Sequence, residues 1–289
     1  MNWAGAYTAL VTPFTRDDRV DYGRLEELIE FQIAGGMDGL VPVGTTGESP
    51  TLTMAEHEKV IAETIRIARR RVKVIAGTGG NSTAEALELT RHARDAGADA
   101  TLQVTPYYNK PTQAGLIRHF TAVADLGLPV ALYNVPGRCS CEIAVDTIVQ
   151  LAAHPQIVAV KEAGGSVDRV SHLARRCDLT LLSGDDALTL PMMAVGAAGV
   201  ISVASNIVPQ AVSRLAHAAL DGAWAEAQAL HRRYHRLFSD LFVETNPIPV
   251  KTALALMGKV EEVFRLPLCP IGPAAREKLL AALRDVELV

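Results

Sequence analysis

The segment Ile157-Val158-Ala159-Val160-Lys161 is a short, β-rich apolar run that ends in a charged residue. Runs of this kind are typical of parallel strands buried on both faces by helices. Seven more recur along the chain, at intervals of roughly 20–35 residues. They are Ala6–Val11, Gly39–Val43, Val72–Ala76, Ala100–Thr105, Val130–Tyr133, Leu179–Ser183 and Gly199–Val203.

Helical patterns separate these runs. Capping boxes open two of the expected helices, one formed by Thr53 with Glu56 and one by Ser82 with Glu85. Apolar residues also recur at helical spacing. One such face is Leu25, Leu28, Ile29 and Ile33, and another is Val60, Ile61, Ile65 and Ala68.

Eight β–α alternations within about 220 residues predict an α/β fold, the (β/α)8 TIM barrel. An open, doubly wound sheet is the second choice. It requires a glycine-rich first turn, which Val11-Thr12-Pro13-Phe14 is not. After about residue 220 the strands stop and helical patterns continue. We therefore expect a catalytic barrel over residues 1–221 and a helical extension over residues 222–289.

Composition narrows the possible partners. The chain has 289 residues, 28 Lys and Arg, 32 Asp and Glu, and a net charge of −4. This mild acidity argues against nucleic acid or an anionic membrane as the main partner. Residues 187–213 carry no charge and are long enough to span a bilayer. Because Pro191, Gly196 and Pro209 interrupt them, a buried helix–strand–helix is expected instead.

The cysteines and the first residues bear on the compartment. Four cysteines occur without the spacing of a disulfide framework, which favours a reducing, cytoplasmic location. The first residues lack the basic segment of a signal peptide. Metal binding is not expected, because Cys139-x-Cys141 has no second pair and the eight His are scattered.

Lys161 is the one lysine that ends an apolar strand. Active sites of such barrels lie at the C-terminal ends of the strands. If Ile157, Ala159 and Lys161 face the barrel axis, the amine lies in the catalytic mouth. Desolvation there lowers the pKa of an amine, and a neutral amine forms a Schiff base with a ketone. The alternative is a snorkelling lysine, or one paired with Glu162.

Other polar groups follow the strands, each with two interpretations. Gly44-Thr45-Thr46-Gly47-Glu48-Ser49 either binds a carboxylate or phosphate or forms an ordinary turn. Tyr107, Tyr108 and Tyr133 either relay protons or pack at the rim. Arg138 either binds a substrate carboxylate or is a surface residue. For Asp185-Asp186, stabilisation of a helix N-terminus is favoured over binding of a metal or amine.

In this order, the strand-end residues resemble the pyruvate-dependent class I aldolase family that includes N-acetylneuraminate lyase. The resemblance covers nearly the whole chain, from Ala6 to Pro270. Its marks are Gly44-Thr-Thr-Gly-Glu48, Thr105-Pro-Tyr-Tyr-Asn109, Tyr133-Asn-Val-Pro136, Val160-Lys-Glu162, Ser183-Gly-Asp-Asp186, Gly199-Val-Ile-Ser202 and Asn246-Pro-Ile-Pro249.

The resemblance implies that Lys161 forms a Schiff base with pyruvate and that Tyr133 shuttles protons. Thr46 would connect Tyr133 to Tyr108 of a neighbouring subunit, with Thr45 in support. No metal or organic cofactor is implied, because Lys161 supplies the electrophilic chemistry.

The resemblance also implies the substrate contacts. The Thr45 and Thr46 region and the Ile201 backbone would hold the pyruvate carboxylate, and Gly184 would lie beside the substrate. Arg138 would hold the carboxylate of L-aspartate 4-semialdehyde, which would be the second substrate of a condensation in lysine and diaminopimelate biosynthesis. Arg138-Cys139-Ser140 departs from the Arg-Thr-Gly found in many members.

Most members of the family form dimers of dimers, so the resemblance implies a homotetramer. Many bind lysine as an inhibitor at the dimer interface. The matching positions here are Ser49, Pro50, Met54, His57, Asn81, Glu85 and Tyr107, of which Met54 departs from a His in some lysine-sensitive members. Three other functions stay open: a sugar-acid pyruvate lyase, a non-catalytic lysine-binding barrel and a phosphate-binding isomerase.

Overall fold

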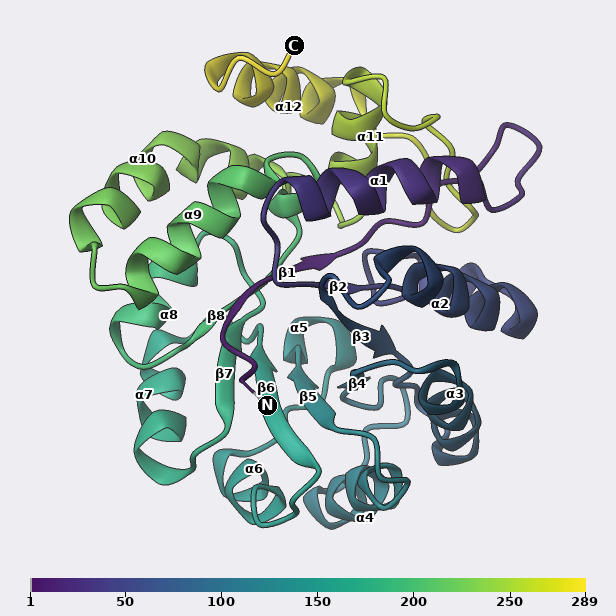
Figure 1. Cartoon of the computed structure of the whole chain (residues 1–289), viewed down its shortest axis with the longest axis vertical. Coiled ribbons are helices and arrows are strands. Elements are labelled where there is room, and N and C mark those ends of the chain that lie inside the picture. Colours follow the sequence, from purple (N-terminus) through teal and green to yellow (C-terminus); the bar gives the residue numbers. More distant parts are fainter. Residues whose placement is uncertain (1) are drawn as a thin grey trace.

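Eight parallel strands close into a barrel in chain order, in a computed structural model that describes residues 2–289 (Figure 1). Each predicted strand is confirmed to within two residues at either end. The strands are β1 (Gly5–Ala9), β2 (Gly39–Val41), β3 (Lys73–Gly77), β4 (Ala100–Val104), β5 (Val130–Asn134), β6 (Ile157–Glu162), β7 (Thr180–Ser183) and β8 (Gly199–Ser202).

A ring of helices covers the outside of the barrel (Figure 1). The predicted (β/α)8 fold is therefore confirmed. The helices that follow the eight strands are α1 (Tyr22–Ala34), α2 (Met54–Ala68), α3 (Thr83–Ala96), α4 (Gln113–Ala124), α6 (Val145–Leu151), α7 (Val167–Arg176), α8 (Thr189–Ala194) and α9 (Pro209–Leu220). Short helices occupy loops after β2, β5 and β8, namely η1 (Ser49–Thr51), α5 (Pro136–Cys139) and η2 (Ala204–Asn206).

Strand alternation divides the apolar core into two layers. Side chains on the barrel axis form one cluster, which includes Ala159 and Tyr133. Side chains between strands and helices form another, which includes Val160. Lys161 lies two residues after Ala159 on β6, so its side chain points to the same axial face, as the alternation predicted.

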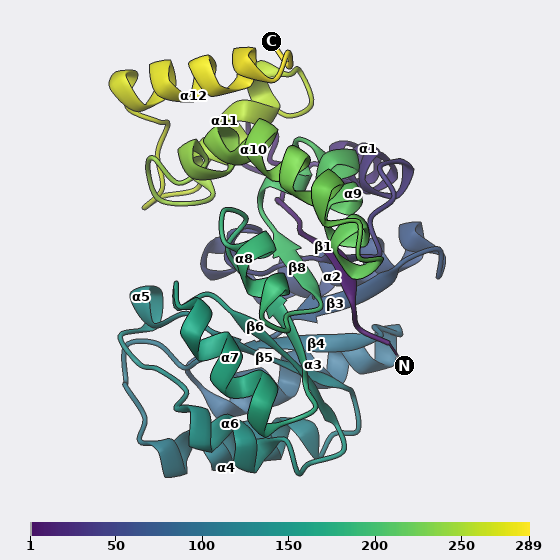
Figure 2. The same cartoon turned by 90° about the vertical axis from the view of Figure 1, so that its left-hand side faces the viewer.

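Three further helices follow the barrel: α10 (Trp224–Asp240), α11 (Ile248–Leu256) and α12 (Pro273–Asp285). Figure 2 shows them stacked to one side of the barrel, next to α1 and α9. These are the extra C-terminal helices expected from the sequence. The expected boundary after residue 221 lies between the end of α9 and the start of α10.

The uncharged stretch 187–213 forms α8, β8, η2 and the start of α9, so the expected helix–strand–helix is confirmed. Within residues 2–289, the helices are all too short or too polar to cross a membrane.

The two expected capping boxes differ. At α2, Glu56 N donates to Thr53 Oγ1 at 3.2 Å and Thr53 N donates back to Glu56 Oε2 at 3.0 Å. At α3, Glu85 N donates to Ser82 Oγ at 3.5 Å, but within residues 2–289 the return bond to the Glu85 carboxylate is absent. The prediction of a capping box at Ser82 and Glu85 is therefore confirmed for only one of its two hydrogen bonds. The pKa of Tyr107 is raised mainly by burial and further by the negative charge of Glu85.

Candidate active site

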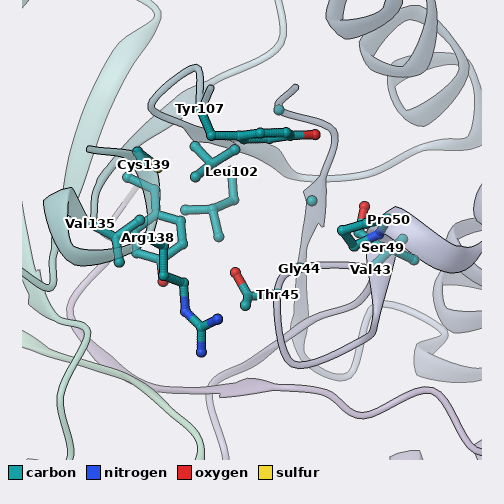
Figure 3. A pocket seen from close by; sticks show the side chains of 14 residues that line it. Val43, Gly44, Thr45, Ser49, Pro50, Leu102, Tyr107, Val135, Arg138 and Cys139 are labelled. Carbon is teal, nitrogen blue, oxygen red and sulfur yellow. The ribbon is translucent and has the colours of Figure 1, made fainter. Parts of the chain in front are cut away.

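A pocket of about 190 Å³ opens at the C-terminal ends of the strands. Figure 3 shows Arg138 and Thr45 directed into it, with Tyr107 on another wall. The pocket thus lies where the active sites of such barrels occur. Its lining is Val43, Gly44, Thr45, Ser49, Pro50, Gly77, Gly79, Leu102, Val104, Tyr107, Tyr133, Val135, Arg138 and Cys139.

Lys161 lies beside Tyr133 at this mouth. The two residues are directly paired between β5 and β6, and Lys161 Nζ is 4.2 Å from the centroid of the Tyr133 ring. The lysine is only 5% exposed. A Cβ on Gly184 would lie 3.0 Å from Lys161 Cε, so glycine leaves room for this side chain. The structure therefore brings a buried amine and a phenol together.

Glu162 does not pair with Lys161. Its carboxylate accepts from Arg169 Nε at 2.8 Å and from Asn134 Nδ2 at 2.9 Å. Neighbouring residues of a strand point to opposite faces, which places this ion pair outside the barrel axis. The ion-paired alternative for Lys161 is thus not realised among residues 2–289.

The loop after β2 is folded by its own backbone. Gly47 N donates to Gly44 O at 3.1 Å, and Glu48 N donates to Thr45 O at 3.2 Å. A Cβ on Gly47 would lie 3.0 Å from the Val43 backbone, so a larger residue does not fit this turn. Thr45 is part of the pocket wall (Figure 3). Thr46 is buried, and its Oγ1 accepts from Asn246 Nδ2 at 3.0 Å.

Arg138 is held in short helix α5, after β5. Its Nη2 donates to the backbone carbonyl of Asn246 at 3.0 Å, while the side chain extends into the pocket (Figure 3). Cys139 lines the same pocket, and burial raises the pKa of its thiol to about 11. At neutral pH the thiol is therefore protonated and a poor nucleophile.

The two tyrosines after β4 face different surroundings. Tyr107 lines the pocket. Tyr108 is 90% exposed and its backbone is left-handed, with φ 73°. Such a φ is uncommon for an aromatic residue. Within one chain, Tyr108 is therefore not brought together with Tyr133.

Three of the seven expected lysine-site positions line the same pocket. Ser49, Pro50 and Tyr107 line it. His57 is buried, and its pKa is lowered to about 4, mainly by burial and further by His92. The other positions are Asn81, whose carbonyl accepts from Asn109 Nδ2 at 2.8 Å, the exposed Glu85, and Met54, which is 42% exposed.

Two further expected positions lie on the β7–β8 side. Ile201 is fully buried in β8, where it pairs with Tyr7 of β1. Asp186 accepts from the Ser202 hydroxyl and from the backbone N–H groups of Val203 and Ala204, at 3.0 Å and 2.9 Å. This carboxylate stabilises the start of η2, which supports the structural interpretation chosen for Asp185-Asp186.

Sequence reasoning missed the contribution of the C-terminal extension to this mouth. Asn246 contacts both Thr46 and Arg138. Lys251 forms a buried ion pair with Glu48 of the loop after β2. The signal in the sequence is Asn246-Pro247-Ile248-Pro249, a mark of the family resemblance that by itself implies no contact with the loop after β2.

The closed parallel (β/α)8 barrel, with a pocket at the C-terminal ends of its strands and a buried lysine paired with a tyrosine beside it, defines the class of (β/α)8 barrel enzymes. The Dihydrodipicolinate synthetase family model matches residues 2–286, and the chain belongs to this family. It is an enzyme of the lyase and synthase type.

Curated relatives and solved structures of the same family are similar to this chain over nearly its whole length. The chain is 51% identical over 288 residues to the 4-hydroxy-tetrahydrodipicolinate synthase of Geobacter metallireducens, covering 99% of both chains. It superposes on dihydrodipicolinate synthase from Aquifex aeolicus with a TM-score of 0.97 and 51% identity, covering 99% of both chains. For the chloride-inhibited enzyme from Acinetobacter baumannii, complexed with pyruvate, the TM-score is 0.98, the identity is 46% and both chains are fully covered.

Proposed function

We propose that this enzyme catalyses the 4-hydroxy-tetrahydrodipicolinate synthase reaction, the condensation of pyruvate with L-aspartate 4-semialdehyde in lysine and diaminopimelate biosynthesis. The placement of Lys161 beside Tyr133 in the mouth carries this proposal. The names of the relatives and the pyruvate complex of the Acinetobacter baumannii enzyme support it.

The chemistry proceeds through the Lys161 amine. It attacks the pyruvate ketone, and loss of water gives an imine, with Tyr133 carrying protons to and from the carbinol oxygen. The imine withdraws electrons, so the methyl carbon loses a proton and becomes an enamine. The enamine carbon attacks the aldehyde. The substrate amine then displaces Lys161 as the ring closes, and no metal or organic cofactor takes part.

The two threonines take separate roles in this proposal. Thr46 Oγ1 accepts from Asn246, which leaves its own proton to donate to the pyruvate carboxylate, together with the Ile201 backbone. The resemblance implies that Thr46 bridges the proton relay with Thr45 in support, but Thr45 and not Thr46 shares the pocket wall with Tyr133, so we assign the bridge to Thr45. The bridge leads to Tyr108 of a neighbouring subunit, which accounts for the exposure of that ring.

Arg138 selects the second substrate. Its guanidinium forms a fork that binds a carboxylate with two parallel hydrogen bonds. Gly184 leaves space beside Lys161 for the growing product. A pyruvate lyase acting on a sugar acid is the alternative within the family.

We also propose a homotetramer, built as a dimer of dimers, in the cytoplasm, with lysine as an inhibitor. The enzyme from Cyanidioschyzon merolae, 42% identical with a TM-score of 0.96, has been solved with lysine bound. The corresponding site here is formed by Ser49, His57, Asn81, Glu85 and Tyr107.

Borohydride trapping with pyruvate, followed by intact mass and peptide mapping, tests the proposal. A pyruvate-sized adduct on Lys161 is expected. Lys251, the other buried lysine, is an internal control that must stay unmodified. A folded protein without an adduct would overturn the Schiff-base mechanism and favour a non-catalytic lysine-binding barrel.

The second substrate is tested with Arg138→Gln. This variant is expected to keep the pyruvate adduct but to lose most of its activity with aspartate semialdehyde, by about a hundredfold or more in kcat/KM. Equal use of the aldehyde by both proteins would favour a sugar-acid lyase.

A further inference from the structure

A fully buried ion pair joins the loop after β2 to the C-terminal extension. Lys251 Nζ in α11 lies 2.5 Å from Glu48 Oε1, and both side chains are fully buried. The amine also donates to Val263 O at 2.8 Å and lies 4.2 Å from the centroid of the Phe14 ring. Glu48 Oε2 accepts from Arg265 N at 3.3 Å.

Stability alone is a weak explanation for this pair. Removing two charges from water costs about as much as their attraction returns, and apolar residues of similar volume serve at least as well. The best-attested use of a buried ionic pair is to specify one relative position of two segments. Since Glu48 and Lys251 are 203 positions apart in the chain, the segments here are distant in sequence.

Both segments carry groups of the site. On the loop side, Thr45 and Thr46 precede Glu48, whose backbone is left-handed with φ 55°. On the other side, Lys251 N donates to Pro247 O, one turn of helix from Asn246. Asn246 in turn contacts the Thr46 hydroxyl and the Arg138 guanidinium, each at 3.0 Å. The ion pair is therefore a second link between the two segments that meet at Asn246.

We propose that Glu48 and Lys251 are positioning residues, which fix the loop after β2 against the Asn246 segment and thereby set the positions of Thr46 and Arg138 relative to each other. The proposal rests on the proposed function, because it assigns these two groups to the two substrate carboxylates. Neither Glu48 nor Lys251 lines the pocket. The Lys251 amine is already occupied by Glu48 and Val263, so it does not act as a second nucleophile.

The test is the double variant Glu48→Gln/Lys251→Met, which removes both charges together and leaves neither one buried alone. The KM values for pyruvate and for aspartate semialdehyde are each expected to rise roughly tenfold or more, with a smaller change in kcat. At saturating pyruvate, borohydride should still trap Lys161. The matched control is Arg276→Met, which breaks the partly buried ion pair with Glu262 in the same extension and should leave both KM values unchanged.

A folded double variant with unaltered KM values would overturn the positioning role. If the double variant does not fold, Lys251→Arg decides, because it keeps the charge but changes the length of the link. The same rise in both KM values is expected there, and unchanged values would overturn the proposal. Absence of trapping in the unmodified enzyme is a different result, because it would refute the proposed function itself.

Discussion

Asn246 lies 200 positions after Thr46 in the chain, yet its side-chain amide donates to the Thr46 hydroxyl at 3.0 Å. The backbone carbonyl of the same residue accepts from Arg138. One residue of the C-terminal extension thus contacts the loop after β2 through its side chain and the segment after β5 through its backbone carbonyl. The extension is therefore part of the mouth and not only a covering of the barrel.

Because Asn246 contacts Thr46 through its side chain and Arg138 through its backbone, we expect Asn246→Ala to affect the two substrates differently. The substitution removes the hydrogen bond to Thr46 but keeps the carbonyl that holds Arg138. Loss of one hydrogen bond corresponds to about a three- to tenfold change in binding. We expect KM for pyruvate to rise by that factor, with KM for aspartate semialdehyde nearly unchanged. Initial rates with each substrate varied in turn measure both, and an equal rise in the two KM values would contradict the prediction.

The exposure of Tyr108 leads us to expect that the active site is shared between two subunits. Its ring is 90% exposed, so it cannot act on Tyr133 of its own chain. Tyr108→Ala and Lys161→Ala are each expected to be nearly inactive alone. When the two are unfolded together and refolded, half of the dimers should be mixed, and each mixed dimer has one complete site. About a quarter of the normal activity should then return. Two variants that remain inactive after mixing would show that each chain forms its own site.

A substitution at Glu85 should separate inhibition by lysine from catalytic turnover. Glu85 is exposed, and within residues 2–289 its carboxylate makes no return hydrogen bond to the cap of α3, so removing it costs little stability. We expect Glu85→Ala to abolish inhibition by lysine while turnover stays near normal. Glu88→Ala, an exposed change on the same helix, is the control. Rates measured against lysine concentration decide, and unchanged inhibition in Glu85→Ala would rule out this site.

The sequence allowed prediction of those features that depend on local pattern. Eight apolar runs were sufficient to place the strands, because each buried strand is short and continuous. Strand alternation was sufficient to place Lys161 on the axial face. Alternation also separates Lys161 from Glu162, but only the structure showed that Arg169 and Asn134 already occupy that carboxylate.

Contacts between distant segments were beyond local pattern. Nothing near Thr46 or Glu48 indicates that Asn246 and Lys251 lie beside them, because the closure of the barrel and the path of the extension bring them together. A relay through Tyr108 needs a second chain and has no signature within one.

His57 predicts a loss of stability in mild acid. Burial, aided by the nearby His92, lowers its pKa from 6.5 to about 4 in the folded chain. Between pH 6.5 and pH 4 the unfolded chain therefore binds one more proton at this position than the folded chain, so stability falls as the pH falls through this window. Each pKa unit is worth about 1.4 kcal/mol, which gives about 2–3 kcal/mol lost by pH 4.5. Urea unfolding at pH 7 and pH 4.5, at one protein concentration, measures this loss. His57→Gln should lose less stability than the unmodified chain by that amount, whereas His172→Gln, at an exposed histidine, should behave like the unmodified chain. Equal losses in all three proteins would mean that His57 does not titrate in this range.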